Sequence, residues 1–385
     1  MALSFWILLG IVLYTFVGYG LVLLLLVKVR GSKISNSVYE KHPPPNVTHI
    51  IAAYNEEDFI EDKIANSLAL NYPSEKYDLW IVTDGSSDRT PDLVGKYPRV
   101  RLFHEAQRNG KIHAVNRVME HVTSPIVIYS DANTELNPDA INNIVRHYHD
   151  PKVGCVAGEK RVRQDEKDSS ASSEGFYWKY ESFLKKYDYQ LYSVVGAAGE
   201  LFSIRTELYE KVDTNMLIED FYLSLSISSK GYRTAYEPDA YAVENSSENI
   251  QEESKRKVRI AAGGFQAMWK LRKLLNIFKF GWLSFQYISH RVLRWAVTPF
   301  VLPLLLIFNY VLALDSLFFR LFLIAQALFY LAAIAGYLLQ KRKIKVKALF
   351  IPFYFTFMNV SVYRGLVRYL KGNQSVLWER AGRKK

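Results

Sequence analysis

Long hydrophobic runs without a single charge lie near both ends of this chain. The first covers residues 5–27, and two more cover residues 296–314 and 321–339. A helix needs about 20 apolar residues to cross a bilayer, so each run is long enough to span a membrane. The pattern predicts an N-terminal transmembrane helix within residues 1–30 and a transmembrane hairpin within residues 296–340.

The last hydrophobic run differs from the other three. Residues 348–363 form a shorter run that is interrupted by Pro352 and Asn359. The chain then ends on basic residues, and a full span here would carry them away from the other basic flanks, against the positive-inside rule. We therefore predict that residues 348–385 form a re-entrant or interfacial segment followed by a basic tail.

Between the first and second hydrophobic runs, short apolar stretches alternate with helical patterns. We predict strands at residues 47–53, 79–83, 100–103, 126–130 and 153–157, and helices at residues 57–70, 111–120, 138–150 and 174–192. Strands that alternate with helices favour a mostly parallel sheet covered by helices on both faces. Residues 46–264 are thus predicted to form an α/β domain, and ligands of such sheets bind beyond the carboxyl ends of the strands.

Residues 265–295 connect this domain to the hydrophobic hairpin. Phe265, Met268 and Trp269 begin a series of apolar residues that are interleaved with lysine and arginine. Such a composition is typical of helices that lie in the plane of the membrane interface. We predict interfacial amphipathic helices over this stretch.

The distribution of charge predicts the orientation in the membrane. The formal net charge is +11, and Lys28, Arg30, Lys33 and Lys41 follow the first hydrophobic run. By the positive-inside rule, the α/β domain is then cytoplasmic, under a plasma (inner) membrane that the chain crosses several times. Basic residues before the hairpin suit anionic headgroups or substrates, and beside membrane spans they give nucleic-acid binding little weight. The lone Cys155 excludes an internal disulfide.

Acidic residues stand at the ends of two predicted strands. Asp84 follows one strand, and Asp131 follows another, with Asn133 two positions later. Asp131 has two interpretations. It is either a helix or turn cap, or a ligand for a hard cation such as Mg²⁺ or Mn²⁺, which takes carboxylate oxygens together with substrate phosphates. Asn133 adds a carbonyl oxygen but no charge.

Lysine and aspartate residues further along have a structural and a functional interpretation as well. Lys111 opens a predicted helix after Asn-Gly, either as a solvated residue or as a phosphate contact at the helix start. Asp220 precedes a helical pattern, either as its N-cap or as a catalytic base. Arg256 and Arg259 face either the membrane surface or a diphosphate.

The order and spacing of these motifs resemble the family-2 inverting glycosyltransferases with a GT-A fold. The resemblance is to the membrane-bound branch related to cellulose, chitin, hyaluronan and poly-N-acetylglucosamine synthases, and it covers residues 46–265 and the layout of the flanking hydrophobic runs. The motifs that carry it are AAYNEE (52–57), VTDGSSDRT (82–90), NGKIHAVN (109–116), YSDANT (129–134), GAAGELFSIR (196–205), LIED (217–220) and RKVRI (256–260).

The resemblance implies a UDP-sugar donor and a glycan or lipid-linked acceptor at the lipid bilayer. The implied nucleotide-sugar-binding residues are Ala53, Tyr54, Asn55, Glu56, Asp84, Lys111, Asp131, Arg256 and Arg259. Asp220 is the implied catalytic base, and Asp131 with Asn133 is the implied site for Mg²⁺ or Mn²⁺. The implied acceptor-side residues are Gly199, Glu200, Glu219 and Trp378.

Departures from the family pattern bear on the function. Asn133 replaces the second acid of the D-x-D metal motif, so metal binding depends more on Asp131 and the donor diphosphate. Ile260 replaces the tryptophan that stacks on the acceptor sugar in processive synthases, which puts long-chain processivity in doubt. Three hypotheses follow: synthesis of a cell-surface polysaccharide, a single addition to a polyprenyl- or other lipid-linked acceptor, and a non-catalytic nucleotide-binding membrane protein. The intact acidic and basic positions weigh against the third.

Overall fold

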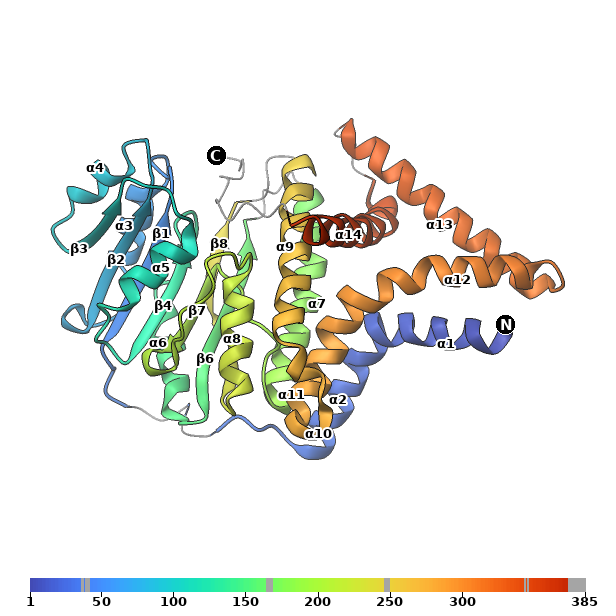
Figure 1. Ribbon diagram of the computed structural model, residues 1–385, viewed down its shortest axis with the longest axis horizontal. Coiled ribbons are helices and arrows are strands. Elements are labelled where there is room, and N and C mark those ends of the chain that lie inside the picture. The colour runs from blue at the N-terminus through green and yellow to red at the C-terminus, as the bar shows by residue number, and fades with distance from the viewer. Residues whose placement is uncertain are drawn as a thin grey trace.

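The protein consists of a sheet domain on one side and long helices that project from it on the other (Figure 1). The computed structural model describes residues 1–35, 38, 42–163, 169–245, 250–342, 344 and 346–372. Trp378, an implied acceptor-side residue, lies outside these residues.

The described residues contain an eight-stranded sheet with the strand order β3-β2-β1-β4-β7-β6-β8-β5. The strands are β1 (Val47–Ala53), β2 (Tyr77–Asp84), β3 (Val100–Glu105), β4 (Ile126–Asp131), β5 (Glu135–Leu136), β6 (Val153–Val162), β7 (Leu201–Arg205) and β8 (Arg233–Glu244). All seven residues of β1 are buried. A strand that is buried on both faces is largely apolar. The two polar side chains of β1 are hydrogen-bonded, Thr48 to Ser124 and His49 to Tyr77 and Ser130.

One strand interrupts the parallel half of the sheet. Strands β3, β2, β1 and β4 pair in parallel, as predicted, but β7 pairs antiparallel with β4. The sheet is therefore mixed. Because β7 runs in the opposite direction, its first residue, Leu201, lies opposite Ser130 near the end of β4. The residues that precede β7 consequently reach the same edge as Asp131.

Helices cover both faces of the sheet, as the alternating pattern predicted. Neighbouring residues of β1 point in opposite directions: Ile50 packs with residues of α5 and α8, whereas Ile51 packs with residues of α3 and α4. The helices of this domain are α3 (Ile60–Leu68), α4 (Thr90–Gly95), α5 (Lys111–Met119), α6 (Ala140–Val145), α7 (Ser169–Leu191), α8 (Glu219–Ser229) and α9 (Ile250–Lys270). Three of them, α3, α5 and α6, are shorter than predicted, and α6 passes into the 3₁₀ turn Arg146–His149.

The projecting part holds, within the described residues, three helical runs long and apolar enough to cross a membrane. They are Ala2–Arg30, Trp282–Ala313 and Leu317–Lys341. The first comprises α1 (Ala2–Leu13), the π-helical turn η1 (Tyr14–Gly18) and α2 (Tyr19–Arg30). The second comprises α11 (Trp282–Tyr287), the π-helical segment η7 (Ile288–Val297) and α12 (Thr298–Ala313), and α13 (Leu317–Lys341) is the third. The predicted hydrophobic runs are thus helical and long enough to cross a membrane, and the second run already begins at Trp282.

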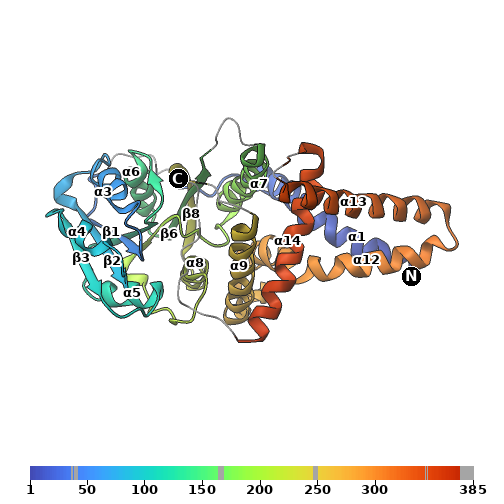
Figure 2. The same ribbon diagram turned by 90° about the horizontal axis from the view of Figure 1, so that it is seen from above.

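The last described helix, α14 (Lys347–Leu370), runs across the other long helices (Figure 2). It packs closely along α9, where a Cβ atom on Gly365 would come within 2.5 Å of the Ala261 Cβ. Only glycine allows such a close approach. The helix therefore lies against the element that carries Arg256 and Arg259. That residues 348–370 do not fully span the membrane stays a prediction.

Candidate active site

The centre of the site is the side chain of Lys111, at the carboxyl edge of the sheet. Its Nζ lies 3.1 Å from Asp131 Oδ1 and 2.8 Å from Glu219 Oε1. Three elements bring these groups together, because β4 ends at Asp131, α5 begins at Lys111 and α8 begins at Glu219. Burial disfavours the charge on Lys111, but Asp131 and Glu219 outweigh burial and raise its pKa. Lys111 is thus a paired residue rather than a freely solvated one.

Asp220 lies beside this cluster with an unusual affinity for protons. Burial, followed by the neighbouring charge of Glu219, raises its pKa from an ordinary 3.8 to about 7. The helix α8 has Ile218 at its N-cap position, so the interpretation of Asp220 as the N-cap is wrong. A buried carboxyl group whose pKa lies near neutrality is suited to taking a proton.

Residues 194–200, here called the acceptor loop, fold around Asp220. Gly196 has φ +91°, and a Cβ atom there would lie 2.2 Å from the ring of Phe221, so the close approach requires glycine. A Cβ on Gly199 would lie 3.4 Å from Asp220 Oδ2 and 3.9 Å from Lys111 Nζ. The open face of Asp220 is therefore bounded by this loop.

A second charged cluster begins at the end of the acceptor loop. The Lys160 Nζ forms ion pairs with both Glu200 and Glu244, and Arg256 Nη1 lies 3.1 Å from Glu244 Oε1. Burial opposes ionisation of Glu200, but Lys160 lowers its pKa. The structure thus pairs Arg256 with Glu244 and not with the Lys111 cluster.

Arg259 acts electrostatically on Glu219, at the centre of the site. Burial alone would raise the pKa of Glu219, but Lys111, with a smaller contribution from Arg259, lowers it instead. The positive charge of Arg259 therefore acts on the same carboxylate that Lys111 contacts.

The residues predicted to bind the nucleotide gather at the ends of β1 and β2. Ala53 ends β1, Asn55 follows with φ 53°, and the guanidinium carbon of Arg108 stacks 3.8 Å from the centre of the Tyr54 ring. The backbone N–H of Glu56 donates to Thr90 Oγ1 over 2.9 Å. These contacts shape a turn beside the carboxyl edge of the sheet.

Asp84 ends β2, as predicted, and holds the loop before α5. Its carboxylate accepts backbone N–H groups from Asn109 at 3.0 Å and from Gly110 at 2.6 Å. This contact fixes the turn from which Lys111 starts. Asp84, Glu105 and His113 form a second possible metal site, here called the trio, since one ligand-type atom from each lies within 4.8 Å of the others. The sequence did not predict this group.

The two candidate metal positions differ in their surroundings. In the trio, Asp84 is already engaged by backbone N–H groups, and Glu105 lies 3.4 Å from Arg117 Nε. Asp131 and Glu219 also converge, and the Lys111 ammonium lies between them. Carboxylate oxygens that converge from two elements suit a hard divalent cation. Asn133 follows in the turn between β4 and β5.

Lys63 is a further residue that the sequence reasoning missed. It is buried, and its Nζ donates to the Thr134 carbonyl oxygen over 2.8 Å, while the Thr134 hydroxyl donates to the Asp131 carbonyl oxygen over 2.8 Å. Burial lowers the pKa of Lys63 to about 7. The available signal was a lysine on the apolar face of a predicted helix, one position before Ile64.

A mixed sheet with these groups at its carboxyl edge and long flanking helices defines a GT-A glycosyltransferase fold. Residues 48–213 match the family model for "Glycosyl transferase family 2". The chain therefore contains a family-2 glycosyltransferase domain, related to that of poly-beta-1,6-N-acetyl-D-glucosamine synthases.

Named relatives and one solved structure support this assignment. The poly-beta-1,6-N-acetyl-D-glucosamine synthase of Staphylococcus aureus (strain MSSA476) is 32% identical over 234 residues, and that of Staphylococcus epidermidis is 27% identical over 235 residues. Each match covers 58% of this chain and 55% of the relative, so the chain spans about half the length of the curated relatives it matches. The mannosyltransferase PcManGT from Pyrobaculum calidifontis, solved with GDP-Man and Mn²⁺, has a TM-score of 0.72 at 23% identity, over 95% of this chain and 98% of the other.

Proposed function

We propose that this protein is an inverting glycosyltransferase that moves a sugar from a UDP-sugar to a polysaccharide or lipid-linked acceptor at the cytoplasmic face of the plasma membrane. The observation that carries the proposal is the meeting of Lys111, Asp131 and Glu219 beside Asp220. A cation for the leaving diphosphate and a base for the attacking hydroxyl are the two groups that such a transfer needs.

Each group has a distinct role in this proposal. Asp220 takes the proton of the acceptor hydroxyl as the hydroxyl oxygen attacks the anomeric carbon of the donor sugar. The bond from that carbon to the diphosphate, on the opposite face, breaks in the same step. Lys111 and Arg259 stabilise the negative charge that develops on the diphosphate. Asp84 is proposed to lie near the base of the nucleotide, and Tyr54 is proposed to bind the same nucleotide sugar. Arg256 supports the acceptor loop through its pairing with Glu244, in addition to its expected place near the donor.

The residues present fit a divalent cation. Asp131 at the end of β4 would supply a carboxylate and Asn133 a neutral oxygen two residues later, with Lys111 as the neighbouring cation. Bound Mg²⁺ or Mn²⁺ would neutralise charge on the donor diphosphate. The Mn²⁺ named with PcManGT supports this cofactor at the level of a shared fold.

The names of the relatives favour polysaccharide synthesis, in cell-surface or exopolysaccharide formation. Ile260, in place of a tryptophan, favours the alternative of a single addition to a lipid-linked acceptor. The meeting of Lys111, Asp131 and Glu219 beside Asp220 weighs against the non-catalytic alternative.

One experiment tests the proposal directly. The purified full-length protein is incubated with a panel of labelled UDP-sugars, with GDP-Man as the comparison that PcManGT suggests. We expect UDP release from one UDP-sugar, and a product whose size distinguishes a polymer from a single addition. Release of GDP alone would overturn the UDP assignment, and release of neither nucleotide with any acceptor would overturn the transferase.

The pH dependence of transfer follows from Asp220. A carboxyl group acts as a base only when it is deprotonated, and its pKa is about 7. We therefore expect the transfer rate to rise as the pH increases through about 7, and to fall about tenfold for each pH unit well below that value. Initial rates between pH 5 and 9, with donor binding measured over the same range, check this. A flat profile would exclude Asp220 as the base.

The orientation in the membrane is tested with a reporter. We expect a reporter fused after Lys385 to be cytoplasmic, because the tail is basic and the positive-inside rule keeps it inside. A matched fusion after Asp315, between the second and third helical runs, should report the opposite side. A reporter outside the cell at Lys385 would mean that residues 348–370 span the bilayer.

A further inference from the structure

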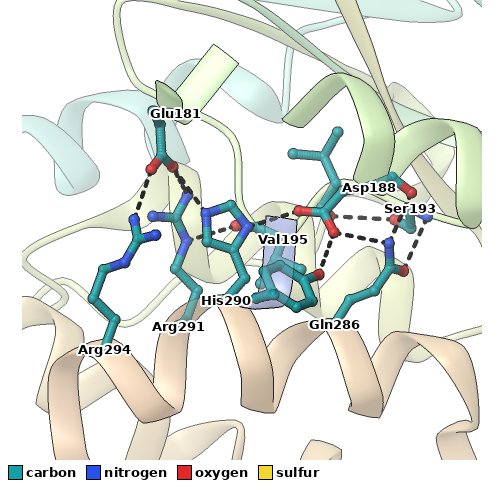
Figure 3. Close-up of polar contacts among 10 residues, drawn as sticks. Glu181, Asp188, Ser193, Val195, Gln286, His290, Arg291 and Arg294 are labelled. Carbon is teal, nitrogen blue, oxygen red and sulfur yellow. Dashed lines mark hydrogen bonds and ion pairs between the residues drawn. The ribbon is translucent and has the colours of Figure 1, made fainter. Parts of the chain in front are cut away.

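A network of buried polar groups joins the sheet domain to the helical run that begins at Trp282. Figure 3 shows two carboxylates of α7, Glu181 and Asp188, that face side chains from this run. The two carboxylates are 3% and 0% exposed, respectively. Buried charges are stable only when each has close partners, so this junction has a defined geometry.

His290 of η7 contacts both carboxylates. Its Nε2 lies 3.3 Å from Glu181 Oε1, and its Nδ1 lies 2.7 Å from Asp188 Oδ2. Asp188 also accepts hydrogen bonds from the Tyr19 hydroxyl at 2.5 Å and from Gln286 Nε2 at 3.0 Å. The first and second membrane-length runs are thus tied to α7 at one point.

Two arginines of η7 pair with Glu181 but differ in their other contacts. Arg291 Nη2 lies 2.6 Å from Glu181 Oε1, and Arg294 Nη1 lies 3.0 Å from Oε2 (Figure 3). Arg291 Nε also donates to the Val195 carbonyl oxygen at 3.0 Å. The guanidinium of Arg294 instead lies 5.9 Å from the ring of Tyr180, which is also on α7.

Val195 belongs to the acceptor loop, and later residues of this loop pack against Asp220. The backbone N–H of Ala197 donates to Ser224 Oγ over 2.9 Å, and this hydroxyl donates to the Asp220 carbonyl oxygen over 2.7 Å. Gly199 lies against the Asp220 carboxylate. One end of the loop is therefore held by Arg291, and the other end bounds Asp220.

We propose that Arg291 is a positioning residue for sugar transfer. From a membrane-length helical run, it fixes the acceptor loop and with it the space in front of Asp220. This inference rests on the proposed function, because the loop faces an acceptor only if the protein transfers a sugar. Small displacements of an acceptor hydroxyl from its base slow a reaction strongly. The donor-side groups Asp84, Lys111 and Asp131, in contrast, lie on β2, α5 and β4, and among the described residues Arg291 has no hydrogen bond to any of them. Arg291 thus governs the rate of transfer to the acceptor and not the affinity for the donor.

Two matched variants of the full-length protein test this. Arg291→Lys and Arg294→Lys each keep a cation beside Glu181, but only the first removes the donor to the Val195 carbonyl oxygen. For Arg291→Lys we expect kcat to fall by about tenfold to a hundredfold, with the KM for the donor and the Kd for UDP within about twofold of wild type. For Arg294→Lys we expect a kcat within about twofold of wild type.

A second measurement does not depend on any substrate. Hydrogen exchange of peptides that cover residues 194–200 should be faster in Arg291→Lys than in wild type, and unchanged in Arg294→Lys. Equal exchange and equal kcat in the two variants would overturn the positioning role. If the wild-type protein transfers no sugar, the proposed function fails, and the exchange comparison alone then decides whether Arg291 holds the loop.

Discussion

Replacement of Asp220 by asparagine is expected to slow sugar transfer at least about a hundredfold while UDP binds about as well as to wild type. The amide keeps the shape of the carboxylate but cannot take the proton of the acceptor hydroxyl. The raised pKa of about 7 marks Asp220 as the carboxylate in this cluster that takes up a proton near neutrality. Burial and the charge of Glu219 hold the pKa of Asp220 at this value. The substitution is therefore expected to slow proton transfer without weakening donor binding.

The measurement compares turnover and UDP affinity on one preparation. Glu219→Gln provides the control, because Glu219 contacts Lys111 directly and its loss should weaken donor binding as well as turnover. Near wild-type turnover in Asp220→Asn would remove Asp220 from the catalytic role. Glu219 would then be the next candidate for the base.

Replacement of Asp131 by alanine is expected to reduce UDP release from the UDP-sugar by at least about a hundredfold. The carboxylate at the end of β4 is the proposed metal ligand, and its partner Asn133 carries no charge that could replace it. Treatment of the wild-type protein with EDTA should have the same effect, and Mn²⁺ or Mg²⁺ should restore activity. Removal of the metal and removal of the Asp131 carboxylate are thus expected to lower UDP release to a similar extent.

Glu105→Gln is the informative control for the metal. Glu105 belongs to the other group of ligand-type atoms, with Asp84 and His113. If the cation is held at Asp131, the Glu105 variant should keep the metal requirement and most of its activity. Full activity of wild type in EDTA would contradict the metal assignment, and loss of metal affinity in Glu105→Gln alone would move it to the trio.

The strands of the parallel half could be predicted because their physics is local. Strands β1, β2 and β4 are buried over most of their length and largely apolar, so their ends located Asp84 and Asp131 correctly, whereas β3 lies at the edge of the sheet and is only partly buried. The three membrane-length runs were evident for the same reason. Strand β7 was not predicted, because its reversed direction depends on which strand it pairs with rather than on its own residues.

The contacts of the site depend on distant elements, and this limits what a sequence can predict. Lys111 and Glu219 are more than one hundred positions apart, yet they are 2.8 Å apart in space. The pairing of Arg256 with Glu244 follows from how α9 is placed relative to β8, which no local pattern encodes. Motif order indicated the family, whereas packing alone decided which charges meet.

The buried junction around Glu181 and Asp188 also limits how far the sheet domain is autonomous. By composition, the sheet domain is hydrophilic and the membrane-length runs are hydrophobic. Glu181 and Asp188 nevertheless have their polar and cationic partners on two of those runs, among them Tyr19 on the first and Arg294 on the second. Removal of one partner of a buried ion pair typically costs about 3–5 kcal/mol, and a folded domain has only about 5–15 kcal/mol in total. A truncated chain that ends before Trp282 would lose the partners that this run gives to Glu181 and Asp188, so we expect the smallest independently folding unit of this protein to include the membrane-length helices.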